Sequence, residues 1–251
     1  MRAPLRALSA AALSLQTPTL LPQHCRVVHR RCSSIRAAHA ASVVQEIYER
    51  AAQGDLDGAA AAMDLLTADD VGLVAGGTGS KPGSPIGYHH VHADDGLSMG
   101  IFVIPAGGEI PLHDHPGMSV LSKLLFGSLR VTAYDMPDAP PPARSLFGRL
   151  GGKERTLACA GPPSVRTVSA PCETLRLDPV AGNIHSFRAL EHTAIFDVLT
   201  PPYNDFDGRS CHYYEEAGPA SGDGVVSLRE VPWPSSLRVV NRPFGGPAVR
   251  F

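Results

Sequence analysis

Long hydrophobic runs are missing from this chain, and no apolar stretch approaches the roughly 20 residues that a membrane-spanning helix requires. A large excess of either charge is missing too, because the formal net charge is −2 over 251 residues. This balance points away from nucleic acid and from acidic membrane surfaces as partners. Aromatic residues make up only 6%, whereas glycine and proline number 25 and 23. The composition therefore favours a fold of many short strands and turns.

Paired cysteines are also missing. The five cysteines contain no C-x-x-C pair. Cys25 and Cys32 lie near the N-terminus, and Cys159 and Cys172 border a proline-rich segment. Five cysteines without a framework indicate a reducing compartment rather than a disulfide-stabilised secreted protein.

Acidic residues are absent before Glu46, although the same segment carries six arginines. Alanine, serine and leucine fill the gaps, which is typical of an organellar transit peptide. A disordered, alanine-rich extension explains the composition equally well. We therefore divide the chain into residues 1–41, a disordered tail or a mitochondrial or chloroplast transit peptide, and residues 42–251, a single domain.

The domain is expected to begin with helices at residues 42–75, where Asp55 and Gly58 mark a break and a cap. Strands are expected at residues 88–92, 97–104, 119–126, 128–134, 174–177, 183–188, 193–200, 225–231 and 237–241. We predict antiparallel hairpins from 88–92 with 97–104, from 119–126 with 128–134, and from 183–188 with 193–200. Residues 136–164 show no period of either kind and predict a long loop.

The most informative stretch begins at Gly107 and contains His113-Asp114-His115. Side chains on a β-strand alternate between faces, so His113 and His115 are expected to point the same way and Asp114 the opposite way. Two imidazoles side by side form half of a metal site. With Gly107 before them and Gly127 after, their spacing resembles the first motif of the cupin superfamily. The alternative is that they are ordinary surface or core histidines.

The cupin motif usually places a glutamate four or five residues after the second histidine, but Ser119 and Val120 stand there. The third ligand is therefore expected elsewhere, and Gly182-Asn183-Ile184-His185 resembles the second cupin motif. Three histidines without a carboxylate differ from the usual oxygenase triad of two histidines and one carboxylate. A neutral set leaves an Fe(II) ion with its full charge, which favours an anionic ligand such as a thiolate beside O2. Ligand type alone does not choose among iron, zinc, copper and nickel.

Four stretches resemble the thiol dioxygenases that comprise plant cysteine oxidases and animal 2-aminoethanethiol (cysteamine) dioxygenase. They are residues 110–118, 182–185, 197–203 and 208–214. The resemblance implies an all-β cupin barrel, of the double-stranded β-helix or jelly-roll type, with short N-terminal helices. It also implies Fe(II) bound by His113, His115 and His185, and insertion of both atoms of O2 into a thiol to give a sulfinic acid (EC 1.13.11).

The plant branch of this family implies a particular substrate, the N-terminal cysteine of a regulatory protein, whose oxidation signals oxygen and marks the protein for degradation. The animal branch also implies cysteamine as a substrate. A cytoplasmic or nuclear monomer is implied, which contrasts with the transit-like N-terminus. We predict a dioxygenase of N-terminal cysteine. The alternatives are a dioxygenase of cysteamine or another small aminothiol, and a non-catalytic metal-binding cupin.

Four further residues match family positions near the active site. Asp197 could pair with the cationic amine of the substrate or orient a ligand, and Tyr203 could donate a hydrogen bond to bound oxygen. A buried structural acceptor and a packed aromatic are equally good interpretations of these two. Cys211 and Tyr213 match a pair that can form a covalent thioether in the animal branch. Two ordinary strand residues are the alternative, and the one we favour.

Overall fold

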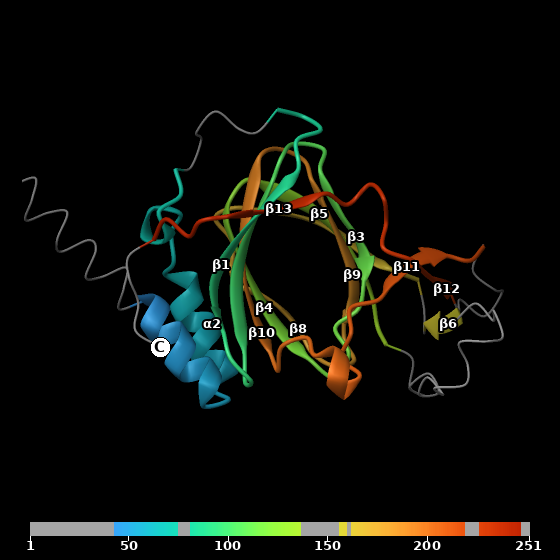
Figure 1. The fold of residues 1–251 in the computed structure, drawn as a ribbon, viewed down its shortest axis with the longest axis horizontal. Coiled ribbons are helices and arrows are strands. Elements are labelled where there is room, and N and C mark those ends of the chain that lie inside the picture. Colours follow the sequence, from blue (N-terminus) through green and yellow to red (C-terminus); the bar gives the residue numbers. More distant parts are fainter. Residues whose placement is uncertain (1–42, 75–80, 137–155, 160–161, 219–225, 247–251) are drawn as a thin grey trace, which may run out of the picture. The chain divides into compact units, whose positions relative to one another are not determined.

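A computed structural model describes residues 43–74, 81–136, 156–159, 162–218 and 226–246. Residues 1–41, predicted as a tail or transit peptide, lie outside the described residues. Two β-sheets face each other, and helices lie against one of them (Figure 1). The prediction of an all-β cupin barrel with short N-terminal helices is confirmed. In the described ranges, no helix is both long and apolar enough to span a bilayer.

The first sheet, sheet A, is nearest the helices. Its six strands lie in the order β13 (Val239–Arg242), β1 (Ile86–Ala93), β2 (Ser98–Ile104), β10 (Thr193–Thr200), β4 (Ser119–Phe126) and β8 (Leu175–Leu177). β1 and β13 are parallel, and the other pairs in the sheet are antiparallel. The predicted hairpin of β1 and β2 is confirmed.

The second sheet, sheet B, forms the opposite side of the barrel. Its seven strands lie in the order β6 (Thr156–Cys159), β12 (Val226–Val231), β11 (Tyr213–Glu216), β3 (Glu109–His113), β9 (Ile184–Ala189), β5 (Ser128–Tyr134) and β7 (Ser164–Ser169). All of its pairs are antiparallel. β3 lies between β11 and β9 in this sheet.

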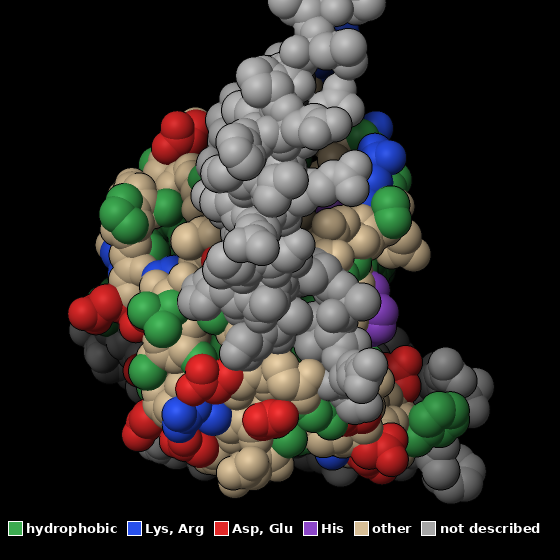
Figure 2. Space-filling model, turned by 90° about the vertical axis from the view of Figure 1, so that its left-hand side faces the viewer, with side chains coloured by type: hydrophobic (Ala, Val, Ile, Leu, Met, Phe, Trp, Pro, Cys, Tyr) green, Lys and Arg blue, Asp and Glu red, His purple; other side chains and the backbone are tan. Residues whose placement is uncertain are grey.

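Helices cover the outer face of sheet A. Residues 43–52 and α2 (Leu56–Asp64) are helical, and a 3-10 turn, η1 (Asp69–Val71), follows. Asp55 caps α2 by accepting a hydrogen bond from the Gly58 N–H at 2.9 Å, so the predicted break and cap are confirmed. The charged face of these helices mixes both signs, as in the Arg50–Glu46 ion pair, and Figure 2 shows red and blue side chains next to one another.

The alternation along β10 shows how the two faces of sheet A differ. Ala194, Phe196 and Val198 pack in the cluster that includes the helices. Ile195 packs instead inside the barrel, in an apolar layer shared by both sheets. The other buried members of that layer are Ile86, Ile104, Ile110, Leu124, Leu129, Val131, Phe187, Ala189, Tyr213 and Leu237. Each such side chain contributes roughly 1.5–3 kcal/mol when fully buried, so the layer is a rigid support for what lies beside it.

Two of the predicted hairpins are wrong. β4 and β5 were expected to pair across Gly127, but they lie in different sheets. β9 and β10 were expected to pair, and they too belong to different sheets. Alternation reveals that a strand has one buried face, but it does not identify the neighbouring strand. Gly127 is the corner where the chain crosses, because its φ is 89° and a Cβ there would lie 2.5 Å from the His192 carbonyl oxygen.

The long loop predicted at residues 136–164 is only partly a loop. β6 lies within it and pairs with β12, and β7 begins at Ser164. Residues 137–155 and 160–161 of this segment lie outside the described residues. The four residues of β6 are too few for a period-2 pattern to stand out beside prolines and glycines.

Candidate metal centre

Three histidines converge on the inner side of sheet B. His113 is the last residue of β3 and lies directly opposite His185 of β9 in the antiparallel ladder. His115 follows two residues later. The three side chains are buried, and one ring nitrogen from each lies within 4.8 Å of the others. The structure thus brings together the three residues predicted as metal ligands, and they are the one such group of metal-binding side chains found among the described residues.

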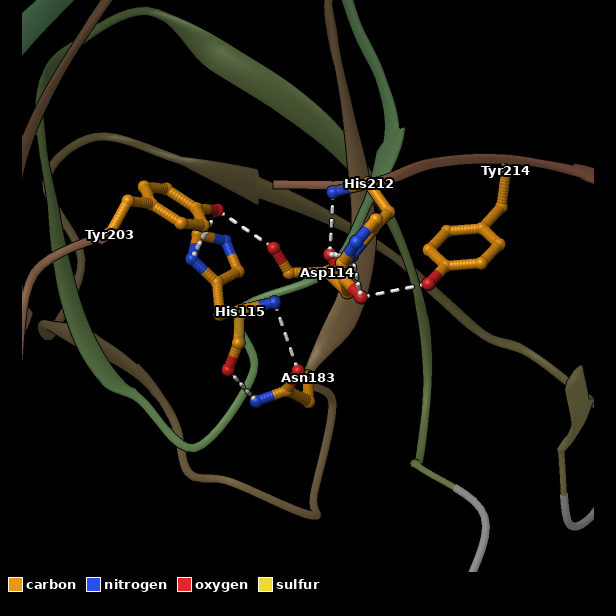
Figure 3. Close-up of polar contacts among 6 residues, drawn as sticks. All are labelled: Asp114, His115, Asn183, Tyr203, His212 and Tyr214. Atoms are coloured by element: carbon orange, nitrogen blue, oxygen red, sulfur yellow. Dashed lines mark hydrogen bonds and ion pairs between the residues drawn. The ribbon is translucent and has the colours of Figure 1, made fainter. Parts of the chain in front are cut away.

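The expectation that one strand holds both His113 and His115 is not met, because β3 ends at His113. His115 lies in the turn that follows, before Gly117, whose φ is 67°. The alternation nevertheless continues past the strand end: both imidazoles join the cluster and Asp114 points away from it (Figure 3). His115 therefore lacks the ladder that positions His113 and His185, and other contacts must position it.

The hydrogen bonds of His113 determine which nitrogen faces the cluster. Its Nδ1 lies 2.8 Å from the Pro111 carbonyl oxygen. A carbonyl can only accept, so Nδ1 carries the proton and Nε2 has a free lone pair. An imidazole whose outer nitrogen donates to a carbonyl is the usual arrangement of a histidine metal ligand.

His115 is oriented by Tyr203 in the same way. The Tyr203 hydroxyl donates its proton to the Asp114 carbonyl oxygen at 2.7 Å and lies 2.8 Å from Nδ1 of His115 (Figure 3). Because that proton is already used, the hydroxyl oxygen must accept from the His115 Nδ1–H. Nε2 of His115 is left unprotonated, and it lies 3.1 Å from Nε2 of His185. The donor set is thus prepared for a cation.

Burial favours the neutral form of all three rings. Desolvation lowers the pKa of His113 and lowers the pKa of His115 and His185 well below the usual histidine value. The mutual proximity of the rings acts in the same direction for His115 and His185. Neutral imidazoles are the form that binds a metal, so no proton has to leave before binding at neutral pH.

Asn183 holds the backbone of His115. Its Oδ1 accepts from the His115 N–H at 3.0 Å, and its Nδ2 donates to the His115 carbonyl at 2.9 Å. The same Nδ2 donates to the Asp178 carbonyl at 2.8 Å. Asn183 is fully buried and stands two residues before His185. One amide therefore ties two of the three histidines together.

Asp197 lies on β10, across the barrel on sheet A. Its carboxylate is buried, and Oδ1 has no hydrogen-bond partner among the described residues. Burial raises the pKa of Asp197 to about 7, and a contact with the Ser122 side chain offsets part of that effect. An unpaired buried carboxyl is costly unless a ligand completes it. Asp197 keeps the same orientation as Ile195, toward the barrel interior.

Tyr203, Cys211 and Tyr213 form a group beside the histidines, here called the tyrosine–cysteine group. Both hydroxyls contact the Cys211 side chain. Burial raises the pKa of Cys211 to about 11 and raises that of Tyr203 well above its usual value. The Tyr213 ring lies 6.1 Å from that of His113, centroid to centroid. β11 begins at Tyr213, so Cys211 lies just before the strand and not on it. The thioether stays the alternative to two ordinary residues.

Some residues of the site were not predicted. Asn183 was only part of a motif, and His212 and Tyr214 had no assigned role, yet both contact the Asp114 side chain (Figure 3). The alternation places Asp114 on the face opposite the metal. This signal alone could have indicated that its carboxylate needs hydrogen-bond donors on that face. The hydroxyl of Tyr203, for which donation to bound oxygen was one of two interpretations, donates to the Asp114 carbonyl oxygen in this structure.

Three neutral histidines on the inner face of a barrel form a candidate metal centre of the cupin type. Comparison with known proteins gives the particular family. The PCO_ADO family model matches residues 60–249, and this chain belongs to that family.

Plant cysteine oxidase 1 from Arabidopsis thaliana is 39% identical over 164 residues, which are 61% of this chain and 52% of that protein. The 2-aminoethanethiol dioxygenase of Homo sapiens is 35% identical over 188 residues, 66% of this chain and 68% of the other. An RmlC-like cupin protein of known structure from Desulfovibrio desulfuricans is 16% identical, with a TM-score of 0.32, over 47% of this chain and 84% of that one. The chain thus spans between half and about two thirds of these curated relatives.

Proposed function

We propose that this chain is a non-haem Fe(II) thiol dioxygenase that uses O2 to oxidise an N-terminal cysteine of a protein or peptide to cysteine sulfinic acid. The observation that carries the proposal is the set of three buried imidazoles with lowered pKa values, one ring nitrogen of each lying within 4.8 Å of the others. The family relationship supplies the class of substrate.

The donor set fits Fe(II). Imidazole nitrogen is a good ligand for iron, and three neutral donors leave positions open for other ligands. Fe(II) bound by His113, His115 and His185 would supply Lewis acidity toward a thiol and electrons for the reaction with O2. The protein keeps Nε2 of His113 and His115 available through the Pro111 carbonyl and the Tyr203 hydroxyl.

Asp197 supplies a group for substrate recognition. Its Oδ1 lacks a partner among the described residues, and its carboxyl sits in an environment that disfavours the charge. A cationic amine beside it would restore the ionised form and complete its hydrogen bonds. An N-terminal cysteine carries such an amine two carbons from its sulfur. We therefore assign Asp197 to the binding of the substrate amine.

The tyrosine–cysteine group limits what else can react. The pKa of Cys211 is raised to about 11, so its thiol stays protonated at neutral pH and does not compete as a nucleophile with a substrate thiol. Tyr203 orients His115. Donation from Tyr203 to bound oxygen would require its hydroxyl to leave the Asp114 carbonyl, and this role stays a prediction.

A small aminothiol is the second candidate substrate. Cysteamine also carries an ammonium group two carbons from a thiol, so Asp197 would serve it equally. The human relative of this chain is named 2-aminoethanethiol dioxygenase. The site chemistry supports both substrates, and activity measurements must separate them.

The test is mass spectrometry of a peptide that begins with cysteine, after incubation with iron-loaded protein in air. Cysteamine is treated in parallel, and His185→Ala is the control for the metal site. We expect the peptide to gain two oxygen atoms with the wild type and none with the control. Oxidation of cysteamine alone would favour the small aminothiol, and oxidation of neither by iron-loaded protein would contradict the proposal and indicate a cupin with some other substrate.

A further inference from the structure

Asp114 is the one residue of the His113–His115 segment that faces away from the metal centre, and it is not an ordinary surface acid. Its side chain is 1% exposed. Its carboxylate accepts from the His212 N–H at 2.8 Å, from Nδ1 of His212 at 3.0 Å and from the Tyr214 hydroxyl at 2.7 Å (Figure 3). Three donors thus converge on one buried carboxylate, and we call this set the Asp114 cluster.

The main chain supports the same connection. The Asp114 N–H donates to the His212 carbonyl at 3.1 Å, while the His212 N–H donates back to the Asp114 side chain. These contacts lie one step beyond the last ladder pair of the two strands, His113 with Tyr213. The Asp114 cluster therefore extends the β3–β11 pairing past the point where β3 ends.

The residues on either side of these two face the barrel interior. His113 and His115 flank Asp114, and both point to the metal centre. Cys211 and Tyr213 flank His212, and both pack with the interior apolar layer. Because side chains alternate along extended chains, the contacts between Asp114 and His212 on the outer side set the separation of the flanking pairs on the inner side.

We propose that Asp114, held by His212 and Tyr214, is a positioning residue that sets the geometry of His115 and its distance from the tyrosine–cysteine group. This inference rests on the metal centre of the proposed function but not on the identity of the thiol. His115 needs such support because no strand ladder holds it. Contacts of this kind around a metal ligand typically change metal affinity by about 10–100-fold.

The first variant is Asp114→Asn, which keeps the shape but replaces one acceptor oxygen with an NH2 group among donors. If the NH2 group takes the place of Oδ2, the His212 Nδ1–H and the Tyr214 hydroxyl lose the oxygen that they share, which weakens the cluster. The second variant, Tyr214→Phe, removes only one donor. It is the milder change, and it tests the proposal if Asp114→Asn fails to fold. The matched control is Asp70→Asn, because Asp70 is also a buried carboxylate and accepts from Thr67 N at 2.9 Å and Thr67 Oγ1 at 2.6 Å.

Two measurements are made on each protein, and neither requires dioxygenase activity. Co(II) is titrated into metal-free protein, with affinity and visible spectrum recorded. Alkylation of each cysteine in the metal-free protein is followed by peptide mass spectrometry, with Cys172 as the internal reference because it is also partly buried. A general loss of stability would expose both Cys172 and Cys211, whereas opening of the Asp114 cluster would expose Cys211 selectively.

We expect Asp114→Asn to weaken Co(II) binding roughly 10–100-fold, to change the Co(II) spectrum, and to raise the alkylation rate of Cys211 relative to Cys172. Tyr214→Phe should show the same changes with a loss of roughly threefold to tenfold, because two donors remain. Asp70→Asn should change neither quantity. Wild-type Co(II) affinity and spectrum in both cluster variants, or equal exposure of the two cysteines, would overturn the proposal. If the two cluster variants change Co(II) binding as expected but the wild type oxidises no thiol, the positioning role of Asp114 is supported and the proposed dioxygenase function is wrong.

Discussion

The two sheets of the barrel carry different parts of the chemistry. Sheet A is packed on its outer face against helices, through residues such as Ile47, Met63 and Phe196. Its inner face contributes one buried carboxyl, Asp197, with an unsatisfied oxygen. Sheet B contributes the histidines on its inner face and the Asp114 cluster on its outer face. Helices therefore support the sheet that would bind the amine, whereas the sheet that would bind the metal is supported by these hydrogen bonds and by a smaller apolar cluster that includes Tyr134, Ile184 and Tyr214.

This difference explains why sheet B has so many polar contacts behind it. A metal ligand has to be oriented as well as placed, and orientation requires hydrogen bonds to the outer nitrogen and to the backbone. His113 and His185 receive part of this from strand pairing. His115 lies beyond the strand and depends on Asn183, Tyr203 and the Asp114 cluster. Substitutions that remove these side chains from each sheet in turn test this difference between the two sheets.

The largest effect is expected from the ligands themselves. His113→Ala and His185→Ala each remove a donor from the centre, so Fe(II) or Co(II) binding should weaken more than the about 100-fold upper range for outer contacts. Equilibrium titration of metal-free protein measures this. His192→Ala is the control, since His192 lies outside the centre and its ring is tilted against that of Phe126, with the centroids 5.2 Å apart. Near-normal metal binding by His185→Ala would place the metal elsewhere.

The next largest effect is expected from Asn183. Asn183→Ala leaves the His115 N–H and carbonyl without buried partners, at a cost of about 1–3 kcal/mol for each group, and should also weaken metal binding. Asn183→Asp preserves the acceptor but places a carboxylate oxygen against the His115 and Asp178 carbonyl oxygens, so it should be no milder than alanine. Denaturant unfolding and Co(II) titration give the two quantities. An alanine variant that loses stability but keeps its metal affinity would show that His115 needs no backbone support.

How far the sequence predicted these features depends on the range of the interaction. The strands at residues 119–126, 128–134 and 193–200 were predicted with the bounds that the structure has, because period-2 alternation is local. The partners of those strands were not, since Gly127 turns the chain into the other sheet. The three histidines were predicted from motif spacing. The support from Asn183 and Tyr214 was not, because it joins segments separated by 68 and 100 residues.

An effect on stability and on substrate binding, but not on metal affinity, is expected from Asp197 of sheet A. Its pKa of about 7 lies above the ordinary value of 3.8, so the folded state retains a proton that the unfolded chain releases. Stability should therefore fall as pH rises from about 4 to about 7, which is opposite in sign to the effect of the histidines. Asp197→Asn removes the carboxylate and should be more stable than the wild type at pH 8, by up to about 4 kcal/mol at about 1.4 per pKa unit.

Denaturant unfolding of both metal-free proteins at pH 5 and pH 8 measures this difference, and the comparison cancels the histidines. A constant difference across this range would mean that Asp197 is ionised in the folded protein. The same substitution should reduce kcat/KM for a peptide with a free N-terminal amine more than for one whose amine is acetylated.

The smallest effect is expected from Tyr203. Tyr203→Phe leaves the ring in place but removes the acceptor for the His115 Nδ1–H. The backbone of His115 keeps its hydrogen bonds to Asn183. Metal affinity should fall by roughly tenfold or less. Co(II) titration measures the loss, with Tyr88→Phe as the control on sheet A. If Tyr203→Phe binds Co(II) normally but oxidises thiols far more slowly, Tyr203 would act on the reaction instead of on His115.

The most direct test of the account is X-ray absorption spectroscopy of the Fe(II)-loaded wild type beside His185→Ala, with iron content measured for both. If His113, His115 and His185 hold Fe(II), the wild type will contain about one iron per chain, with three imidazole ligands at roughly 2.0–2.2 Å. The variant will lose the iron or one imidazole. A wild-type spectrum with carboxylate or sulfur from the protein in place of one imidazole, or a site that binds zinc but no iron, would contradict this assignment.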